Sequence, residues 1–520
     1  MANKQTTASP ASGSQPGSRF QAARPLAVLA AITVAAAWVR LHALGARCFW
    51  LDEGITAGYM RLGWYGTTRL LWRREGNMSL YFILLGGWLQ FGDSEAWYRA
   101  LSVLFAVATV PVIYAIGARL FGTRAGLLAA LLMALNAYHV RYSQEARSYA
   151  LAVFLVTLAA WFLVRAVQDG RRRDWNWYVA CGALAAYAHF YAVLAIAAHW
   201  VSLRLSREDA SAEARPKREC KRAMKLMGLW TLPIWVFLIT TGVGVLSWLR
   251  RPGWSELYSF LTHYAGNAGA PLLLLYLTCI LLALGAAVRS RNFRGDSLAT
   301  WKYGLAFCWF FVPVAIVLAV TVAKPVFLAR YLIIALPGLA LMAAAGMESV
   351  RRNWLILPLA AAIAWLGIGG IRSYYEKDFD IVRADYRGAA AHVLANALPG
   401  DALLFHQANA RYAYDYYAGR FAGAKARPVI VAPGHGDRPV WRDFMSRVTP
   451  QVLETATHDY SRVWVLLSNN TGPQGEDPLT GQIRSALGQR LRLVEERGFE
   501  GIRLCLYASS SGILYGIRHF

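Results

Sequence analysis

The run PLAVLAAITVAAAWVRLHAL, residues 25–44, is almost entirely apolar and is long enough to cross a lipid bilayer as one helix. Similar apolar runs recur as far as Ile371, and short loops rich in Lys and Arg separate many of them. The 520 residues are 57% hydrophobic and 16% charged, with a mean hydropathy of +0.33. Soluble domains carry about 25% charged residues. The sequence therefore predicts a polytopic α-helical membrane protein.

Hydropathy and the placement of basic residues together predict roughly eleven spans within residues 25–372. The predicted spans are 25–44, 96–120, 125–138, 149–167, 175–188, 191–205, 226–249, 270–288, 301–322, 331–347 and 354–371. The run Leu80–Phe91 is short for a span, so we expect it to be interfacial or re-entrant, with a tilted span as the alternative. The basic loop 207–225 favours the cytoplasm. The first loop, 45–79, then falls on the outer side of a cell inner (cytoplasmic) membrane.

The two ends of the chain differ from the apolar runs. Residues 1–24 are rich in Ser, Gln, Ala and Pro and predict a disordered cytoplasmic tail. Residues 373–520 alternate between helical and strand patterns, which predicts an outer-face (periplasmic) α/β domain with a mainly parallel sheet. The expected helices are 385–398, 444–457 and 479–487, and the expected strands are 402–405, 428–431, 463–467 and the closing pair in 491–507. We assign this domain no catalytic role, since it has no glycine-rich phosphate loop.

The net charge of +24 does not indicate nucleic-acid binding, because the basic residues lie mostly between apolar runs and no reading motif accompanies them. The six cysteines show no metal-binding spacing. Only Cys48 and Cys505 are candidates to meet on the oxidising side. We expect free thiols.

An acidic pair, Asp52-Glu53, follows the first span. Carboxylates beside a bilayer are costly and mark candidate functional sites. A carboxylate next to an apolar surface is suited to act as a general base. The alternative is structural: Asp52 caps a helix that begins near Glu53.

Two further polar clusters fall on the same predicted face. The first is YSQEARSY, residues 142–149, in which Glu145 and Arg147 either pair with each other or face a site. The second is KPVFLARY, residues 324–331, where Lys324 and Arg330 stand against the positive-inside trend. Snorkelling explains one such cation more easily than two, whereas a bound phosphate explains both.

Outer aromatic residues are typical of the interfacial belt and also suit stacking on a sugar. His189, in a tight outer turn, is a candidate base or ligand, with a structural role as the alternative. Carboxylates and separate cations on one face suit group transfer from a lipid-linked phosphate. Such a reaction needs a base for the acceptor hydroxyl and cations for the departing phosphate.

The segments WLDE (50–53), YSQEARSY (142–149) and ARYLIIALP (329–337) together resemble the family 39-type GT-C glycosyltransferases. That family includes the protein O-mannosyltransferases and the aminoarabinose transferases of lipid A. The tail segments DYRGAA (385–390) and PGD (399–401) resemble the outer domain of bacterial members. The resemblance covers most of the chain.

The resemblance implies inverting transfer from a polyprenyl-phosphate sugar to an outer-face lipid, glycan or protein acceptor. It implies Asp52 as the base, with Glu53 and Glu145 shaping the site, and Arg330 in contact with the donor phosphate. We add Lys324 and Arg147 as phosphate-binding candidates. The substrate-binding candidates are Tyr59, Tyr81, Tyr149, His189 and Tyr331.

The chain departs from the family at one point. Asn77-Met78-Ser79 stand before Leu80-Tyr81, where members often carry His-Pro-Pro or Lys-Pro-Pro, so the donor contacts or the acceptor differ. Arg73 or Arg74 is a candidate substitute. Metal use varies within the GT-C class, so a divalent metal stays open.

Two other functions remain as alternatives. A transporter or flippase for a lipid-linked or anionic substrate needs charges near the membrane midplane and often repeated halves, which the sequence does not show. A non-catalytic scaffold would use the α/β tail for binding. The sugar, the prenyl chain and the acceptor stay open.

Overall fold

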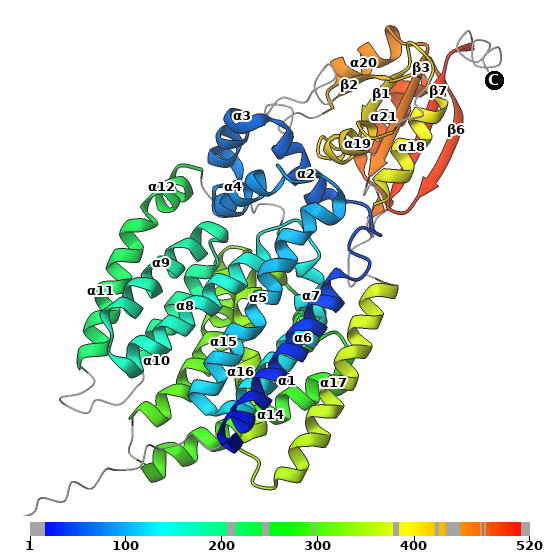
Figure 1. Cartoon of the computed structure of the whole chain (residues 1–520). Coiled ribbons are helices and arrows are strands. Elements are labelled where there is room, and N and C mark those ends of the chain that lie inside the picture. The colour runs from blue at the N-terminus through cyan, green and yellow to red at the C-terminus, as the bar shows by residue number, and fades with distance from the viewer. Residues whose placement is uncertain are drawn as a thin grey trace, which may run out of the picture.

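The protein is described here by a computed structural model that covers residues 16–204, 214–241, 249–294, 297–377, 384–421, 426–432, 448–468, 471–472 and 475–510. The chain forms a bundle of long helices with a small α/β domain at one end (Figure 1). The predicted fold class, a helical membrane protein with a C-terminal α/β domain, is confirmed.

Twelve labelled helices build the bundle. They are α1 (Pro16–Leu41), α5 (Glu95–Phe121), α6 (Thr123–Leu135), α8 (Tyr149–Asp169), α9 (Arg172–Ala188), α10 (Ala192–Arg204), α11 (Ala214–Trp230), α12 (Leu232–Thr241), α14 (Gly269–Arg294), α15 (Ser297–Ala323), α16 (Leu336–Glu348) and α17 (Asn353–Glu376). Among the described residues, seven helices are long and apolar enough to cross a membrane. The bent pair α11–α12, with a 54° break at Thr231, makes an eighth if it is one span.

The predicted count of eleven spans is not confirmed. The other three predicted crossings correspond to α6, α9 and α10, which have 13, 17 and 13 residues. A 13-residue helix is about 20 Å long, against a hydrocarbon core of about 30 Å. These three crossings stay predictions.

Two boundaries differ from expectation. α1 begins at Pro16, so residues 16–24 are helical and were wrongly predicted to be disordered. Extending a helix that has already formed costs little, and proline suits the first turn. Residues 1–15 lie outside the described residues. In the basic segment 207–225, residues 214–225 belong to helix α11, and the residues before Ala214 lie outside the described part.

Short helices gather at the end of the bundle that carries the α/β domain. They include α2 (Leu51–Arg61), α3 (Gly63–Leu70) and α4 (Ser79–Trp88), and α1 begins at the opposite end (Figure 1). α4 has ten residues, too few to cross a bilayer, in agreement with the interfacial expectation for Leu80–Phe91. α7 (Ala137–Ser143) and α13 (Trp254–Ala265) are the other short helices used below.

The α/β domain contains α18 (Tyr386–Asn396), β1 (Ala402–Phe405), α19 (Ala410–Ala418), β2 (Val429–Ala432), α20 (Pro450–His458), β3 (Arg462–Ser468), α21 (Pro478–Gly488), β6 (Arg492–Phe499) and β7 (Ile502–Ala508). Its main sheet has the order β2-β1-β3-β7-β6, and β4 (Thr471–Gly472) pairs with β5 (Gly475–Glu476) separately.

The main sheet is mixed, so the expected mainly parallel sheet is wrong. β1 pairs in parallel with β2 and β3, whereas β7 pairs antiparallel with β3 and β6. β6 and β7 are joined only by Glu500 and Gly501, and strands joined by so short a turn must be antiparallel. Gly501 has φ +65°, which that turn requires.

Alternating residues of the sheet face two different cores. Leu404 and Val465 pack in a separate cluster with residues of α20 and α21. Phe405 and Leu466 pack instead in the large cluster that includes α18, α19 and the bundle. α19 was not predicted from the sequence. The predicted helix 444–457 corresponds to α20, and its residues before 448 lie outside the described part. Cys48 and Cys505 are free thiols, as expected.

Candidate active site

Asp52 and Glu53 both lie in the first turn of α2. This helix begins at Leu51, and its N-cap residue is Trp50, whose side chain makes no capping hydrogen bond. The alternative in which Asp52 caps the helix is therefore wrong, because Asp52 lies inside it. Carboxylates in a first turn are stabilised by the helix dipole, by about 0.3–1 kcal/mol each.

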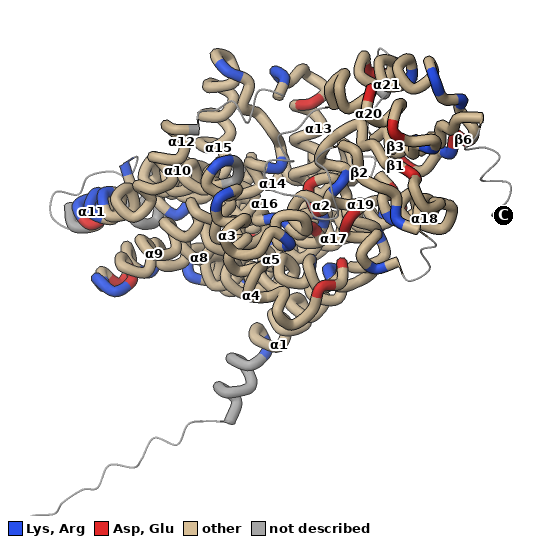
Figure 2. Tube along the Cα trace, turned by 90° about the horizontal axis from the view of Figure 1, so that it is seen from above, with Lys and Arg blue, Asp and Glu red and all other residues tan. Residues whose placement is uncertain are grey.

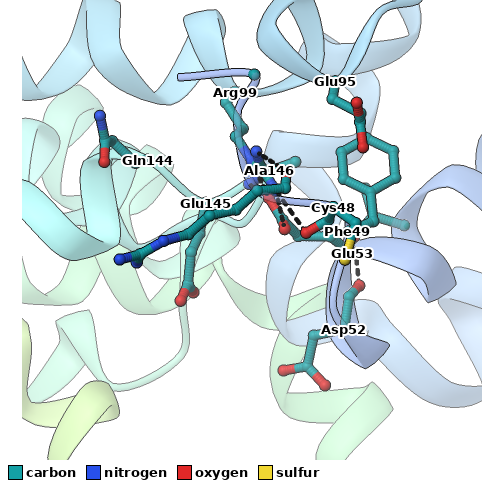
Figure 3. A network of polar contacts seen from close by, with 12 residues as sticks. Cys48, Phe49, Asp52, Glu53, Glu95, Arg99, Gln144, Glu145 and Ala146 are labelled. Carbon is teal, nitrogen blue, oxygen red and sulfur yellow. Dashed lines mark hydrogen bonds and ion pairs between the residues drawn. The ribbon is translucent and has the colours of Figure 1, made fainter. Parts of the chain in front are cut away.

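Glu53 is a buried member of an ion pair. Arg99 of α5 donates to both carboxylate oxygens over 2.7 Å, and the amide N–H of Ala146 donates to Oε1 over 3.0 Å (Figure 3). Arg99 also donates to the carbonyls of Leu44 and Arg47 over 2.8 Å. Glu53 thus ties α2 to α5 and to the segment after α7. These contacts hold its carboxylate in place, and Glu53 stays a candidate for shaping the site.

Asp52 instead faces Arg330. Oδ2 of Asp52 lies 3.5 Å from Nη2 of Arg330, and the two side chains are 18% and 14% exposed. Arg330 belongs to a short 3₁₀ segment, Ala329–Ala335, just before α16. Its guanidinium lies 5.6 Å from the ring centroid of Trp50 and 5.9 Å from that of Tyr331. The tertiary structure therefore joins two predicted residues that are far apart in the sequence.

The segment after α7 forms another wall of the site. Oε1 of Glu145 lies 4.0 Å from Nε of Arg141, and both side chains are buried. The hydroxyl of Ser102 on α5 donates to the carbonyl of Arg147 over 3.2 Å and shares a 2.9 Å hydrogen bond with the hydroxyl of Tyr81. In Figure 3 the carboxylates of Asp52 and Glu145 extend to the same side of the network around Arg99.

Four aromatic rings lie together beside Arg330. Tyr331 lies 6.4 Å from Tyr149, 4.9 Å from His189 and 5.2 Å from Tyr191, measured between ring centroids. The backbone N–H of Tyr191 donates to Nδ1 of His189 over 3.2 Å. The proton of the neutral imidazole then resides on Nε2, which makes that atom a donor. Burial, with the nearby Arg147 and Arg330 charges, lowers the pKa of His189 to about 3, so the ring is neutral.

Several buried polar atoms around this ring cluster lack a hydrogen-bond partner among the described residues. They are Trp50 Nε1, Tyr149 Oη, His189 Nε2 and Arg330 Nε. A buried polar group left unpaired costs about 1–3 kcal/mol, so such groups are normally satisfied by a ligand or by water. Three of the four are N–H donors, and the tyrosine hydroxyl is able to donate as well. An arrangement of four groups that donate hydrogen bonds is suited to bind an anion.

Two expected site residues, Tyr59 and Lys324, have different surroundings from the others. Tyr59 is buried in a small hydrophobic cluster with Phe82 and Tyr412, its ring centroid 5.5 Å from that of Phe82. Lys324 follows the last residue of α15 and is exposed. The sequence shows that Lys324 is positively charged, but it does not show that the side chain is exposed.

Sequence reasoning missed Arg99 and Ser102. Both lie within the predicted span 96–120, and a charged residue inside an apolar run was the available signal for Arg99. As for a metal, the described residues contain no group of three or more His, Cys, Asp and Glu side chains able to hold one.

A helical bundle with short helices and a small α/β domain at one end agrees with the fold expected from the resemblance to GT-C proteins. The family model for dolichyl-phosphate-mannose-protein mannosyltransferases matches residues 76–212. That range contains Tyr81, Arg99, Glu145 and His189. It leaves out Asp52 and Arg330.

Solved structures support the same class over nearly the whole chain. ArnT from Cupriavidus metallidurans in the apo state is 14% identical with a TM-score of 0.62, covering 94% of this chain and 98% of that one. The same protein bound to undecaprenyl phosphate is 12% identical with a TM-score of 0.61 and the same coverage. The archaeal oligosaccharyltransferase AglB from Archaeoglobus fulgidus, with an inhibitory peptide and a dolichol-phosphate, is 10% identical with a TM-score of 0.51, covering 86% of this chain and 70% of that one. No curated protein sequence matches the chain.

Proposed function

We propose that this protein is a membrane glycosyltransferase that moves a sugar from a polyprenyl-phosphate-linked donor to an acceptor hydroxyl on the outer face of the cytoplasmic membrane. The observation that carries the proposal is the set of buried, unpaired donors beside the Asp52–Arg330 pair. The ArnT structure with undecaprenyl phosphate supports it, because that protein shares the fold and binds a lipid phosphate.

The proposed chemistry follows from this arrangement. Asp52 accepts the proton of the acceptor hydroxyl as its oxygen bonds to the anomeric carbon with inversion. The bond from that carbon to the phosphate oxygen breaks, and the phosphate keeps the electron pair. Arg330, Tyr149 and His189 Nε2 donate to the charge that develops on the phosphate. When no sugar donor is bound, Arg330 pairs with Asp52. The phosphate of an arriving sugar donor competes for the guanidinium of Arg330 and so frees Asp52 to act as the base.

A cavity lies beside the segment that leads into Arg330. A cavity of about 540 Å³ opens between α13 and the segment Phe327–Ala329, with Arg250 and Arg251 on its wall. Drug-sized ligands occupy cavities of about 300–1,000 Å³. We propose that a substrate enters here; a lipid, a glycan and a protein all remain candidate acceptors.

The test compares envelope lipids and glycans by mass spectrometry in a strain that lacks this protein. We expect one sugar to be missing from an envelope molecule and its lipid-linked donor to accumulate. Wild type should restore the sugar, and Asp52→Asn, which keeps the side-chain shape, should not. Asp169→Asn is the matched control, because Asp169 pairs with Arg119 away from the site. Restoration by Asp52→Asn would refute the role of Asp52.

A further inference from the structure

The helix that carries Asp52 packs directly on α19 of the α/β domain, and two glycines allow the close approach. A Cβ atom at Gly54 would lie 2.7 Å from Cβ of Ala413 and 3.0 Å from its Cα and N. A Cβ at Gly58 would lie 2.7 Å from the ring of Tyr412. Carbon atoms in contact prefer separations of about 3.5–4.0 Å. Any larger residue at these two positions would therefore push α2 and α19 apart.

α19 also holds both ends of α2. The backbone N–H of Phe49, just before the helix, donates to the hydroxyl of Tyr417 over 2.6 Å. That hydroxyl in turn donates to Glu95, at the start of α5. At the other end, Nη1 of Arg61 donates to the carbonyl of Asp415 over 2.7 Å. The start, middle and end of α2 thus all contact one helix of the α/β domain.

These contacts lie on the face of α2 opposite to Asp52. At about 100° per residue, Gly54 and Gly58 are roughly 200° and 240° around the helix from Asp52, and Arg61 is roughly 180°. α19 therefore supports the back of α2 while Asp52 points at Arg330. A displacement of α2 by α19 would move the carboxylate directly toward or away from the guanidinium.

We propose that α19 is a positioning element for catalysis, which sets the distance between Asp52 and Arg330 through its contact with Gly54 and Gly58. The inference rests on the proposed function and extends it, because it gives the α/β domain a part in turnover. Misplacing a catalytic group by about 1 Å can cost about 100-fold in rate. The contact at Gly54 is short enough for one added methyl group to produce such a shift.

The test uses the full chain in lipid nanodiscs with a polyprenyl-phosphate sugar that wild type accepts. Gly54→Ala should lower kcat by about 10- to 100-fold. Its Kd for undecaprenyl phosphate should change much less than kcat, because Arg330, Tyr149 and His189 do not lie on α2 and only Trp50 and Asp52 move with that helix. Gly86→Ala is the matched control, since a Cβ there meets nothing within 4 Å and α4 is also a short helix.

A second substitution distinguishes positioning from general destabilisation. Adding Ala413→Gly to Gly54→Ala removes the 2.7 Å contact and leaves those at 3.0 Å, so part of the lost kcat should return. If Gly54→Ala does not fold, Tyr417→Phe replaces it. Loss of the hydroxyl that holds Phe49 should lower kcat at least about threefold, with a smaller change in Kd.

Three results would overturn the inference: wild-type kcat in Gly54→Ala, no recovery in the double variant, or wild-type kcat in Tyr417→Phe. In each case an active wild type leaves the proposed function standing. A wild type that transfers no sugar from any lipid-linked donor would refute the proposed function and this inference together.

Discussion

At the scale of single residues, two adjacent carboxylates differ because of what surrounds them. Glu53 has its oxygens filled by Arg99 and the amide of Ala146, whereas Asp52 has one guanidinium at 3.5 Å and partial exposure. A carboxylate whose lone pairs are already used by buried donors is a poor proton acceptor. Of these two carboxylates, Asp52 is the one that we propose as the base.

The first prediction separates these roles by stability. Glu53→Gln should lower the free energy of unfolding by about 3–5 kcal/mol, because it leaves the buried Arg99 charge without its partner. Asp52→Asn should stay near wild type. Thermal unfolding in detergent measures both, with Glu256→Gln, an exposed acid on α13, as the control. Equal unfolding temperatures for Glu53→Gln and wild type would contradict the buried-pair interpretation.

The second prediction compares the two cations of the segment 324–331. Arg330→Ala should weaken binding of undecaprenyl phosphate by about 10- to 100-fold, the loss expected for a charge-assisted hydrogen bond of 1.5–3 kcal/mol. Lys324→Ala should bind almost as wild type, because Lys324 is exposed at the end of α15. Calorimetric titration gives both constants. Equal losses in the two variants would restore the sequence-based view that both cations bind phosphate.

At the scale of elements, the bundle is held by polar contacts as well as by apolar packing. Over residues 24–41, more than half of α1 is exposed, yet Arg40 near its end is fully buried. Its guanidinium donates to the carbonyls of Met133 and Ala134 over 3.0 Å and lies 2.9 Å from Nδ1 of His139. One side chain therefore joins the first span to α6 and α7.

The third prediction concerns this joint. Arg40→Met should lower the free energy of unfolding by about 2–4 kcal/mol, because it leaves several buried acceptors unpaired at about 1–3 kcal/mol each. Arg24→Met, at an exposed position on the same helix, serves as the control. Thermal unfolding in one detergent gives the comparison. A difference below about 0.5 kcal/mol, the range of ordinary surface substitutions, would show that α1 needs no such joint.

At the scale of the whole molecule, basic residues predict how the bundle is oriented in the membrane. Figure 2 shows Lys and Arg along α11 at the edge of the bundle, and the predicted site lies at the end that carries the α/β domain. Basic residues close to span ends favour the cytoplasm. The α/β domain and Asp52 are then expected on the outer side.

The fourth prediction tests this orientation in intact cells. A cysteine at Arg490, exposed on the α/β domain, should react with a membrane-impermeant maleimide. A cysteine at Arg172, exposed at the start of α9, should react only after the cells are opened. The native cysteines are buried or half-buried, which keeps the background low. The reverse labelling pattern would place the site in the cytoplasm.

The sequence by itself determined the features that follow from local composition. Apolar length sets where helices are expected to cross, and short continuous apolar runs placed β1, β2 and β3 to within a residue or two. It also singled out Asp52, Glu145 and Arg330, because charges beside lipid are costly. Local patterns do not report pairing partners. The different roles expected for Asp52 and Glu53 came only from the family resemblance, and the Glu53–Arg99 pair was not predicted.

Only the tertiary structure decided which of these residues meet. Asp52 and Arg330 approach through helices far apart in the sequence, and Arg99 becomes the partner of Glu53 only when α5 packs on α2. The sequence gives no indication that Gly54 and Gly58 matter, because their contacts with α19 appear only in the tertiary structure. Close contacts between distant segments depend on the packing of the whole chain, and no window of sequence contains both partners.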